Sequence, residues 1–248
     1  NHGGLMDEVA RWPAAERAEL FREAAARMGV APLLIEKDIW VCWTLKRIFS
    51  LTDRAILFKG GTSLSKAFGV IRRFSEDIDL SFDRGEFGYR AERDPANPAL
   101  SGTTKKKLLK EMMGACSEYV SGAYLEALRA KLASGGADST WRLLPDDTDP
   151  DRATLFFEYP KALSAGDYGG GYVRPAVRIE FGVRSEHQGA VTATVSPYAA
   201  EEFATRFDDS GVRVVVQTAE RTFWEKATAL HEKAFRGFRG KVDRFSRH

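Results

Sequence analysis

Two short stretches decide the fold: KGGTSLSK at residues 59–66 and RFSEDIDL at residues 73–80. A β-rich run at residues 55–58 leads into the Gly60–Gly61 pair, which is typical of a strand that ends in a tight turn before a helix. The second stretch is extended again. We therefore predict a strand–helix–strand unit over residues 55–82, with a glycine turn whose bare N–H groups can hold an anion.

Two aspartates, Asp77 and Asp79, stand two residues apart in the second stretch. Side chains at this spacing in a strand point to the same face, so Ile78 and Leu80 point to the other face and into a core. The usual explanation of such a pair is a solvated strand face. Aspartate is disfavoured in strands, however, and the nearby glycine turn favours a functional pair.

A third carboxylate, Glu180, lies in the strand-like run at residues 177–181, where apolar side chains alternate with polar ones. Nucleotidyl transfer needs a held triphosphate and divalent ions, and Mg²⁺ or Mn²⁺ takes hard oxygen ligands. We therefore predict that Asp77, Asp79 and Glu180 are metal ligands and catalytic residues. Glu180 is also placed to take the proton of an attacking hydroxyl.

The predicted nucleoside triphosphate (NTP) site draws on both stretches. Either hydroxyl at Thr62 or Ser63 can donate to a phosphate, and the alternative is that it caps the helix. The cations at residues 66 and 73 can neutralise phosphate, or can instead pair with surface carboxylates. The residues assigned to this site are Lys59, Gly60, Gly61, Thr62, Ser63, Lys66 and Arg73.

The Gly-Gly-Thr motif, the Arg-x-Ser-x-Asp-x-Asp run and their spacing resemble the AbiEii/AbiGii-type toxins, which include the MenT toxins. These toxins form a branch of the DNA polymerase β-like nucleotidyltransferase superfamily. Residues 177–181 resemble the third-carboxylate strand of that family, and residues 221–231 resemble its lysine-bearing helix. The resemblance covers roughly residues 55–248 and implies that Lys226 binds nucleotide. The alternative is that Lys226 only lies along the edge of a buried apolar stripe.

The resemblance implies a metal-dependent enzyme that moves a nucleoside monophosphate (NMP) from an NTP to an acceptor hydroxyl, plausibly at the 3′ end of tRNA. It further implies a toxin with a cognate antitoxin. Two alternatives stay open: transfer to a small molecule or protein, and an inert binding module on the same fold. Relatives continue past a pair like Arg247–His248 with two tyrosines and a catalytic aspartate, and it stays open whether that motif follows His248 in this protein.

Composition sets the remaining limits. The 248 residues carry a net charge of only +2, so we look for local positive charge, which occurs at residues 105–110 and 231–248. Each run fits either a polyanionic acceptor or a solvated face. Cys42 and Cys116 have no partner at metal-ligand spacing, which predicts reduced thiols. No apolar run approaches the roughly 20 residues of a membrane span, so we expect a cytoplasmic protein without a membrane partner. The oligomeric state stays open.

The predicted class is α+β, with a nucleotidyltransferase-like mixed, mainly antiparallel sheet flanked by helices and additional helical segments. We expect one unit over residues 1–248, with a helical lobe from about residue 218 as the alternative. Trp40 and Trp43 are expected in the core, rather than as a platform for bases. Helices are predicted at residues 14–28, from Pro32, at 105–132 (as one long helix or two) and at 220–235, and strands at 55–58, 77–82, 153–159, 173–183, 190–195 and 212–217.

Overall fold

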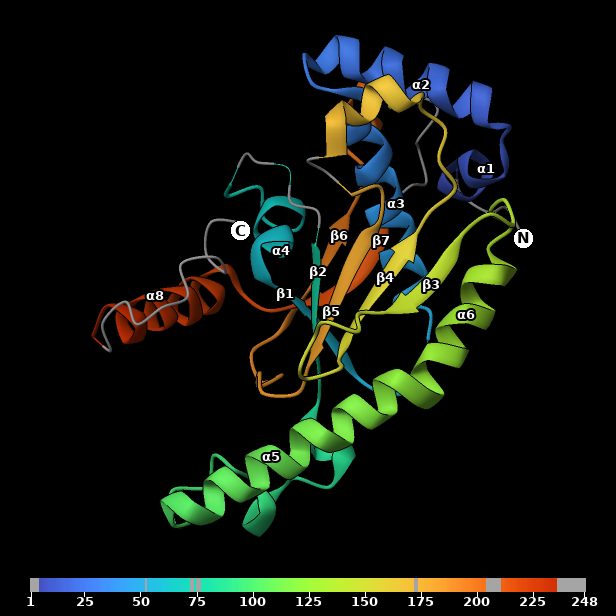
Figure 1. Ribbon diagram of the computed structural model, residues 1–248. Helices are drawn as coiled ribbons and strands as arrows, with labels where there is room; N and C mark the ends of the chain where they lie inside the picture. The colour runs from blue at the N-terminus through green and yellow to red at the C-terminus, as the bar shows by residue number, and fades with distance from the viewer. Residues whose placement is uncertain are drawn as a thin grey trace.

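The structure, a computed structural model, describes residues 5–51, 53–71, 74, 77–171, 174–203 and 211–235. Its strands are β1 (Ile56–Lys59), β2 (Asp77–Phe82), β3 (Arg142–Pro145), β4 (Thr154–Glu158), β5 (Val177–Gly182), β6 (Val191–Val195) and β7 (Val212–Val216). They form a seven-stranded sheet in the order β3-β4-β5-β2-β1-β7-β6 (Figure 1).

The sheet is mixed, as predicted. The pairs β1–β2, β3–β4, β4–β5 and β6–β7 are antiparallel, whereas β1–β7 and β2–β5 are parallel. Strands β4 and β5 are antiparallel neighbours, and their connection contains a 3₁₀ segment at Ala165–Gly171. Strand β3 was not predicted, because its four residues are too few to show an alternating pattern.

The helices are α1 (Leu5–Arg11), α2 (Ala14–Met28), α3 (Pro32–Ile48), α4 (Gly60–Lys66), α5 (Gly102–Tyr119), α6 (Leu125–Ser134), α7 (Ala199–Glu202) and α8 (Ala219–Phe235). The predicted helices are present, and the short helices α1 and α7 were not predicted. Helix α2 ends at Gly29 in the left-handed conformation (φ +67°), and Pro32 begins α3. Between α5 and α6 the chain kinks at Gly122, so the long run predicted at 105–132 is two joined helices.

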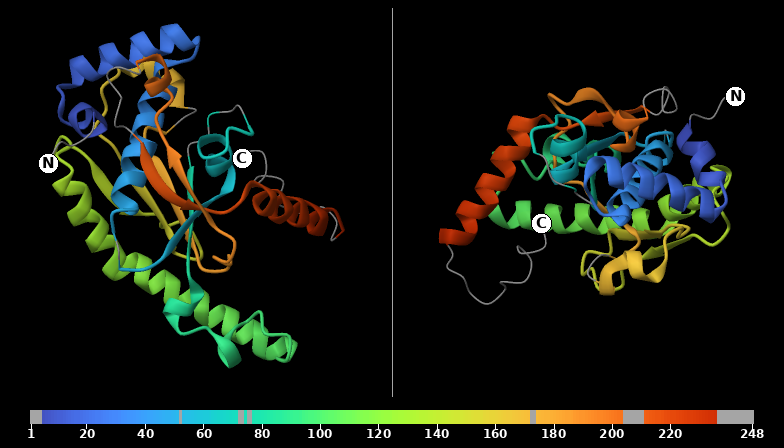
Figure 2. Two further views of the ribbon diagram at one scale, coloured as in Figure 1. Left: turned by 180° about the vertical axis from the view of Figure 1, so that it is seen from behind. Right: turned by 90° about the horizontal axis from the view of Figure 1, so that it is seen from above.

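The main core lies between one face of the sheet and helix α3. Figure 1 shows α3 passing behind the strands, and Figure 2, seen from behind, shows it crossing in front of them. Trp40 and Trp43 are 1% and 0% exposed, and they stack on Tyr159 and Phe157 respectively. Both tryptophans are therefore core residues, as predicted, and are not available to stack on bases.

Helix α3 also carries three consecutive charged residues that are buried. Glu36 accepts hydrogen bonds from the Ala162 N–H (2.8 Å) and the Tyr168 hydroxyl (2.9 Å). The ammonium of Lys37 donates to the carbonyl of Arg174 at 3.1 Å. Asp38 pairs with Lys66 and accepts from the Tyr198 N–H at 2.6 Å. Since buried charges need partners, these residues tie three segments of the chain to α3.

Both cysteines are free and buried, as the sequence predicted. Burial raises the pKa of Cys42 and of Cys116 to about 12, which keeps both thiols protonated at neutral pH. Among the described residues, no helix has the length and apolar character needed to cross a membrane.

Candidate functional site

Three carboxylates share the face of the sheet that is opposite to α3. Asp79 lies beside Lys59 of β1 and beside Glu180 of β5, whereas Asp77 lies beside Arg178. Neighbouring strands are about 4.8 Å apart, and Asp77 and Asp79 are two residues apart along β2. The structure thus brings the three predicted carboxylates together on neighbouring strands, and all three are partly exposed.

The glycine turn packs directly against this acidic group. Gly60 has φ +80°, a conformation that side chains with a Cβ rarely adopt. A Cβ added at Gly60 would overlap the carboxylate of Asp79. Glycine is therefore required at residue 60 for two reasons, the backbone angle and the close approach of the turn to Asp79.

The carboxylate of Glu180 forms an ion pair with an arginine of its own strand. Arg178, two residues earlier on the same face, forms an ion pair with Glu180 and lies 3.9 Å from an Asp146 oxygen. Across the residues that the structure describes, no group of three or more His, Cys, Asp or Glu side chains is arranged to hold a metal ion. The three carboxylates are neighbours, but they do not form the preassembled metal cluster that we expected.

The donor set nevertheless fits a hard divalent ion. Mg²⁺ is commonly bound by one or two carboxylates together with substrate phosphates and water, instead of by a complete protein cage. Asp77 and Asp79 supply two such carboxylates on one face, and Glu180 adds a third once it is released from Arg178.

The hydroxyls of the first stretch do not cap α4, which was the predicted alternative, but donate to backbone carbonyls. Thr62 is fully buried, and its hydroxyl donates to the carbonyl of Asp77, which ties α4 to the start of β2. Ser63 is also fully buried and donates to the Gly60 carbonyl at 2.9 Å. Both residues shape the turn beside the carboxylates, and neither hydroxyl is exposed for a phosphate.

Lys66 also turns inward. Its side chain is 2% exposed and forms an ion pair with Asp38, whose side chain is 3% exposed. The ammonium also donates to the Ser196 carbonyl at 3.0 Å and lies 3.4 Å from the centre of the Tyr198 ring. Burial, the largest single influence, lowers the pKa of Lys66, but Asp38 together with Cys42 and Tyr198 gives a net rise. We therefore leave Lys66 out of the phosphate site.

The remaining phosphate candidates differ in their positions. Lys59 is half-buried and lies across the strand pair from Asp79, where its charge can reach a bound anion. Gly61 is buried in the first turn of α4. Arg73 lies outside the described residues.

Helix α8, which carries Lys226, has the predicted bounds but not the predicted burial. Phe223 and Leu230, expected on its buried face, are 60% and 55% exposed, and Thr222 is the one buried residue of the described helix. The expectation of a buried stripe was wrong, because helical periodicity shows an apolar face but not what covers it. Lys226 itself is exposed.

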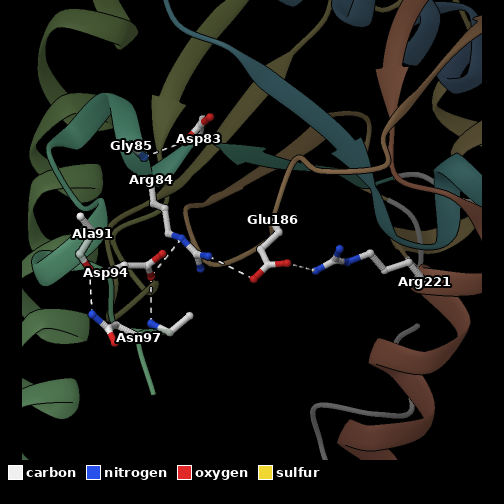
Figure 3. Close-up of polar contacts among 9 residues, drawn as sticks. Asp83, Arg84, Gly85, Ala91, Asp94, Asn97, Glu186 and Arg221 are labelled. Carbon is white, nitrogen blue, oxygen red and sulfur yellow. Dashed lines mark hydrogen bonds and ion pairs between the residues drawn. The ribbon is translucent and has the colours of Figure 1, made fainter. Parts of the chain in front are cut away.

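Two contacts locate the first turns of α8. The helix touches α4, and an ion-pair chain joins it to the loop after β2 (Figure 3). In this chain Glu186 accepts from Arg221 of α8 at 3.2 Å and from Arg84 at 3.1 Å. The Arg221 and Arg84 guanidinium groups lower the pKa of the Glu186 carboxyl.

With this geometry in place, comparison with known proteins identifies the family. Residues 43–248 match the family model described as nucleotidyl transferase AbiEii toxin, type IV toxin–antitoxin system. The chain belongs to the AbiEii nucleotidyltransferase toxin family. None of the curated proteins compared with the chain matches it significantly.

Among solved structures, the AbiEii-family chain is similar to MenT4, a nucleotidyltransferase toxin from Mycobacterium tuberculosis H37Rv. The two are 18% identical with a TM-score of 0.47, and the match covers 86% of this chain and 58% of MenT4. This chain therefore spans little more than half the length of that relative.

Arg178 lies beside these carboxylates, and the sequence analysis gave it no role. It shares the strand face of Glu180. Burial raises the pKa of Asp149, but hydrogen bonds from Thr154, Asp151 and Ala153, together with the charge of Arg178, give a net lowering. The signal was present as the i, i+2 spacing of an arginine and a glutamate.

Proposed function

We propose that this chain is a metal-dependent nucleotidyltransferase that moves an NMP from an NTP to a hydroxyl of an RNA acceptor, with the 3′ end of tRNA as the expected target. We further propose that it acts as the toxin of a toxin–antitoxin pair. Family membership supports the reaction class. The observation that carries the site assignment is the packing of the Gly60 turn against Asp79, beside Asp77 and Glu180.

In this reaction the acceptor oxygen attacks the α-phosphorus of the NTP, and the bond from that phosphorus to the leaving pyrophosphate breaks. Divalent ions, when bound, supply charge stabilisation to the attacking and leaving oxygens. Asp77 and Asp79 are the residues that would hold them. Lys59, which lies beside Asp79, can add positive charge near the phosphates, and Lys226 is assigned the same role from the family resemblance alone. Glu180 is the carboxylate proposed to take the hydroxyl proton.

The test uses the full chain with each α-³²P-labelled NTP and with tRNA, total RNA, protein and small-molecule acceptors in Mg²⁺. Wild type should label RNA. Asp77→Asn and Asp79→Asn should each lower the rate at least about 100-fold, since they remove groups that act on the reacting phosphate. Because the label is on the α-phosphate, transfer of a γ-phosphate gives no signal.

A matched control is Glu158→Gln. Glu158 is a partly exposed carboxylate of β4, paired with Arg142 and Arg174 rather than placed beside Asp79. This variant should keep near-normal activity. Labelling of protein or a small molecule alone would replace the RNA assignment, and full activity in both aspartate variants would rule out the site.

A further inference from the structure

A basic groove of about 270 Å³ lies between the loop after β2 and helix α5. Four cationic and four apolar residues line it, and no acidic side chain is among the described residues that do so. The lining residues are Arg84, Lys105, Lys106, Arg184, Pro95, Ala96, Leu109 and Met112.

Three of these four cations are available to an anion. Within the described part of the chain, Lys105 and Lys106 form no ion pair, and the guanidinium of Arg184 contacts the Met113 Sδ (2.7 Å) instead of a carboxylate. Arg84 is different, because it pairs with Asp94 at 3.3 Å and with Glu186 at 3.1 Å. The groove therefore combines one cation that is fixed in place with three that have no carboxylate partner.

The floor of the groove is apolar. Met112 is 1% exposed, Leu109 is half-buried, and Pro95 and Ala96 lie across from them. Inorganic phosphate alone would leave this apolar surface unused. A nucleotide unit uses both parts, with its phosphate on the cations and its base on the apolar floor or on the guanidinium plane of Arg184.

We propose that this groove binds one nucleotide unit of the acceptor strand, remote from the reacting end. The inference rests on the proposed function for its acceptor. Arg84 is seven positions beyond Asp77, and β2 spans most of that distance. The groove and the carboxylate site are therefore about 23 Å apart along the protein chain. At 3.4 Å per nucleotide in a helical strand, this span is about seven nucleotides.

The ion-pair chain of Figure 3 connects the groove to helix α8. Arg84 at the edge of the groove joins through the carboxylate of Glu186 to Arg221 on α8, the helix that also carries Lys226. The groove is thus linked, through two arginines that flank one carboxylate, to the helix that contacts α4.

The test measures binding of fluorescent single-stranded RNA to the full chain in EDTA, where no transfer occurs. A 15-mer, a 3-mer and a mononucleotide are compared at several salt concentrations. The 15-mer can span both sites and should bind at least tenfold more tightly than the 3-mer. Lys105→Glu/Lys106→Glu should weaken 15-mer binding at least tenfold and reduce the salt slope by about 0.7, the value for one phosphate contact on a single strand.

The matched control is Lys107→Glu/Lys110→Glu, which makes the same charge change on the same helix outside the groove. It should have less than a threefold effect. Arg184→Ala should weaken binding without reversing any charge. Equal losses of RNA affinity in both double variants would indicate diffuse electrostatic attraction instead of binding in the groove. Unchanged affinity in the groove variants would overturn the assignment of the site. Tight binding of the mononucleotide with no gain for the 15-mer would indicate a free-nucleotide site.

Two further outcomes separate this inference from the proposed function. If wild type labels RNA but the groove variants bind the 15-mer normally, the function stands and the groove assignment fails. If the groove binds RNA as expected but no NTP labels it, the proposed reaction fails. A groove variant that loses binding of an acidic protein, such as an antitoxin, while still binding RNA would overturn the nucleotide assignment.

Discussion

At the scale of single residues, Gly60 gives the sharpest prediction. Gly60→Ala introduces a Cβ at φ +80° and against the Asp79 carboxylate. The left-handed angle alone costs about 1–2 kcal/mol. Displacement of Asp79 should also lower the transfer rate about 100-fold, as small shifts in reacting geometry commonly do. Steady-state rates and urea denaturation measure the two effects separately.

Gly69 supplies the control. It also has a positive φ (+62°), but a Cβ there would meet nothing within 4 Å. Gly69→Ala should therefore lose similar stability and keep its activity. Equal losses of activity in the two variants would show that the contact with Asp79 is unimportant.

Arg178 leads to a second prediction at this scale. Its guanidinium lies among Glu180, Asp146 and Asp77 and offsets their mutual repulsion. Arg178→Gln should lower the melting temperature in EDTA, and Mn²⁺ should restore it, because the ion replaces the lost positive charge. The stabilisation by Mn²⁺ should thus be larger in the variant than in wild type.

Arg142→Gln is the comparison for Arg178→Gln. Arg142 pairs with Glu158 on the same sheet, but at its edge. Loss of the Arg142 charge should leave the Mn²⁺-induced shift in melting temperature the same as in wild type. A smaller Mn²⁺ shift in Arg178→Gln would mean that Arg178 supports metal binding instead of replacing the metal.

The carboxylate face could be predicted from single residues, whereas the fate of the lysines could not. Alternation alone places Asp77 and Asp79 together, because a strand has no other choice of faces. The direction of Lys66 depends on Asp38, which lies 28 positions earlier in the sequence, in a helix whose apolar stripe gave no sign of a buried charge. Such pairings form only through tertiary contact.

At the scale of elements, α8 shows that sequence patterns can predict the bounds of a helix without predicting its burial. Its bounds follow from local propensity and were predicted within one residue, but its exposure depends on neighbours that periodicity does not identify. The helix is located by Thr222, by its contact with α4 and by the bridge from Arg221 to Glu186. The bridge is the part that can be removed without disturbing the core.

Glu186→Gln should loosen both α8 and the loop at residues 84–94, which hydrogen exchange can measure. The stability at stake is about 0.5–1 kcal/mol, since the pair is partly exposed. The lowered pKa of Glu186 means that, as pH falls, the unfolded chain takes up the proton first. The difference in melting temperature from wild type should be constant well above pH 4.3, the ordinary value for glutamate, and should shrink below it.

Glu225→Gln separates the bridge from local helix pairing. Glu225 lies 3.8 Å from Arg221 within the same helix and does not reach the loop. It should speed exchange in α8 alone. Faster exchange of the loop in this variant, or a difference in melting temperature for Glu186→Gln that does not shrink as pH falls, would contradict the bridge.

At the scale of the whole molecule, the parallel pairing of β2 with β5 is what completes the site. One hundred residues separate Asp79 from the neighbouring Glu180 in the sequence, and no local pattern predicts that adjacency. The family resemblance suggested it, and the register now shows it. Helix α3 has the complementary role, because its buried Glu36, Lys37 and Asp38 fix the segments that surround the sheet.

Variants of the Asp38–Lys66 ion pair test two points together: the structural role of the buried charges on α3, and whether Lys66 binds phosphate. Asp38→Ala leaves the ammonium of Lys66 buried without its carboxylate and should cost about 3–5 kcal/mol in urea denaturation. Asp38→Leu/Lys66→Met replaces both charges with apolar groups and should recover most of that loss. Since Lys66 faces the core, the double variant should keep a KM for NTP within about threefold of wild type, a change of under 1 kcal/mol. Recovered stability with a KM raised more than tenfold would instead place Lys66 at the triphosphate, as the sequence alone suggested.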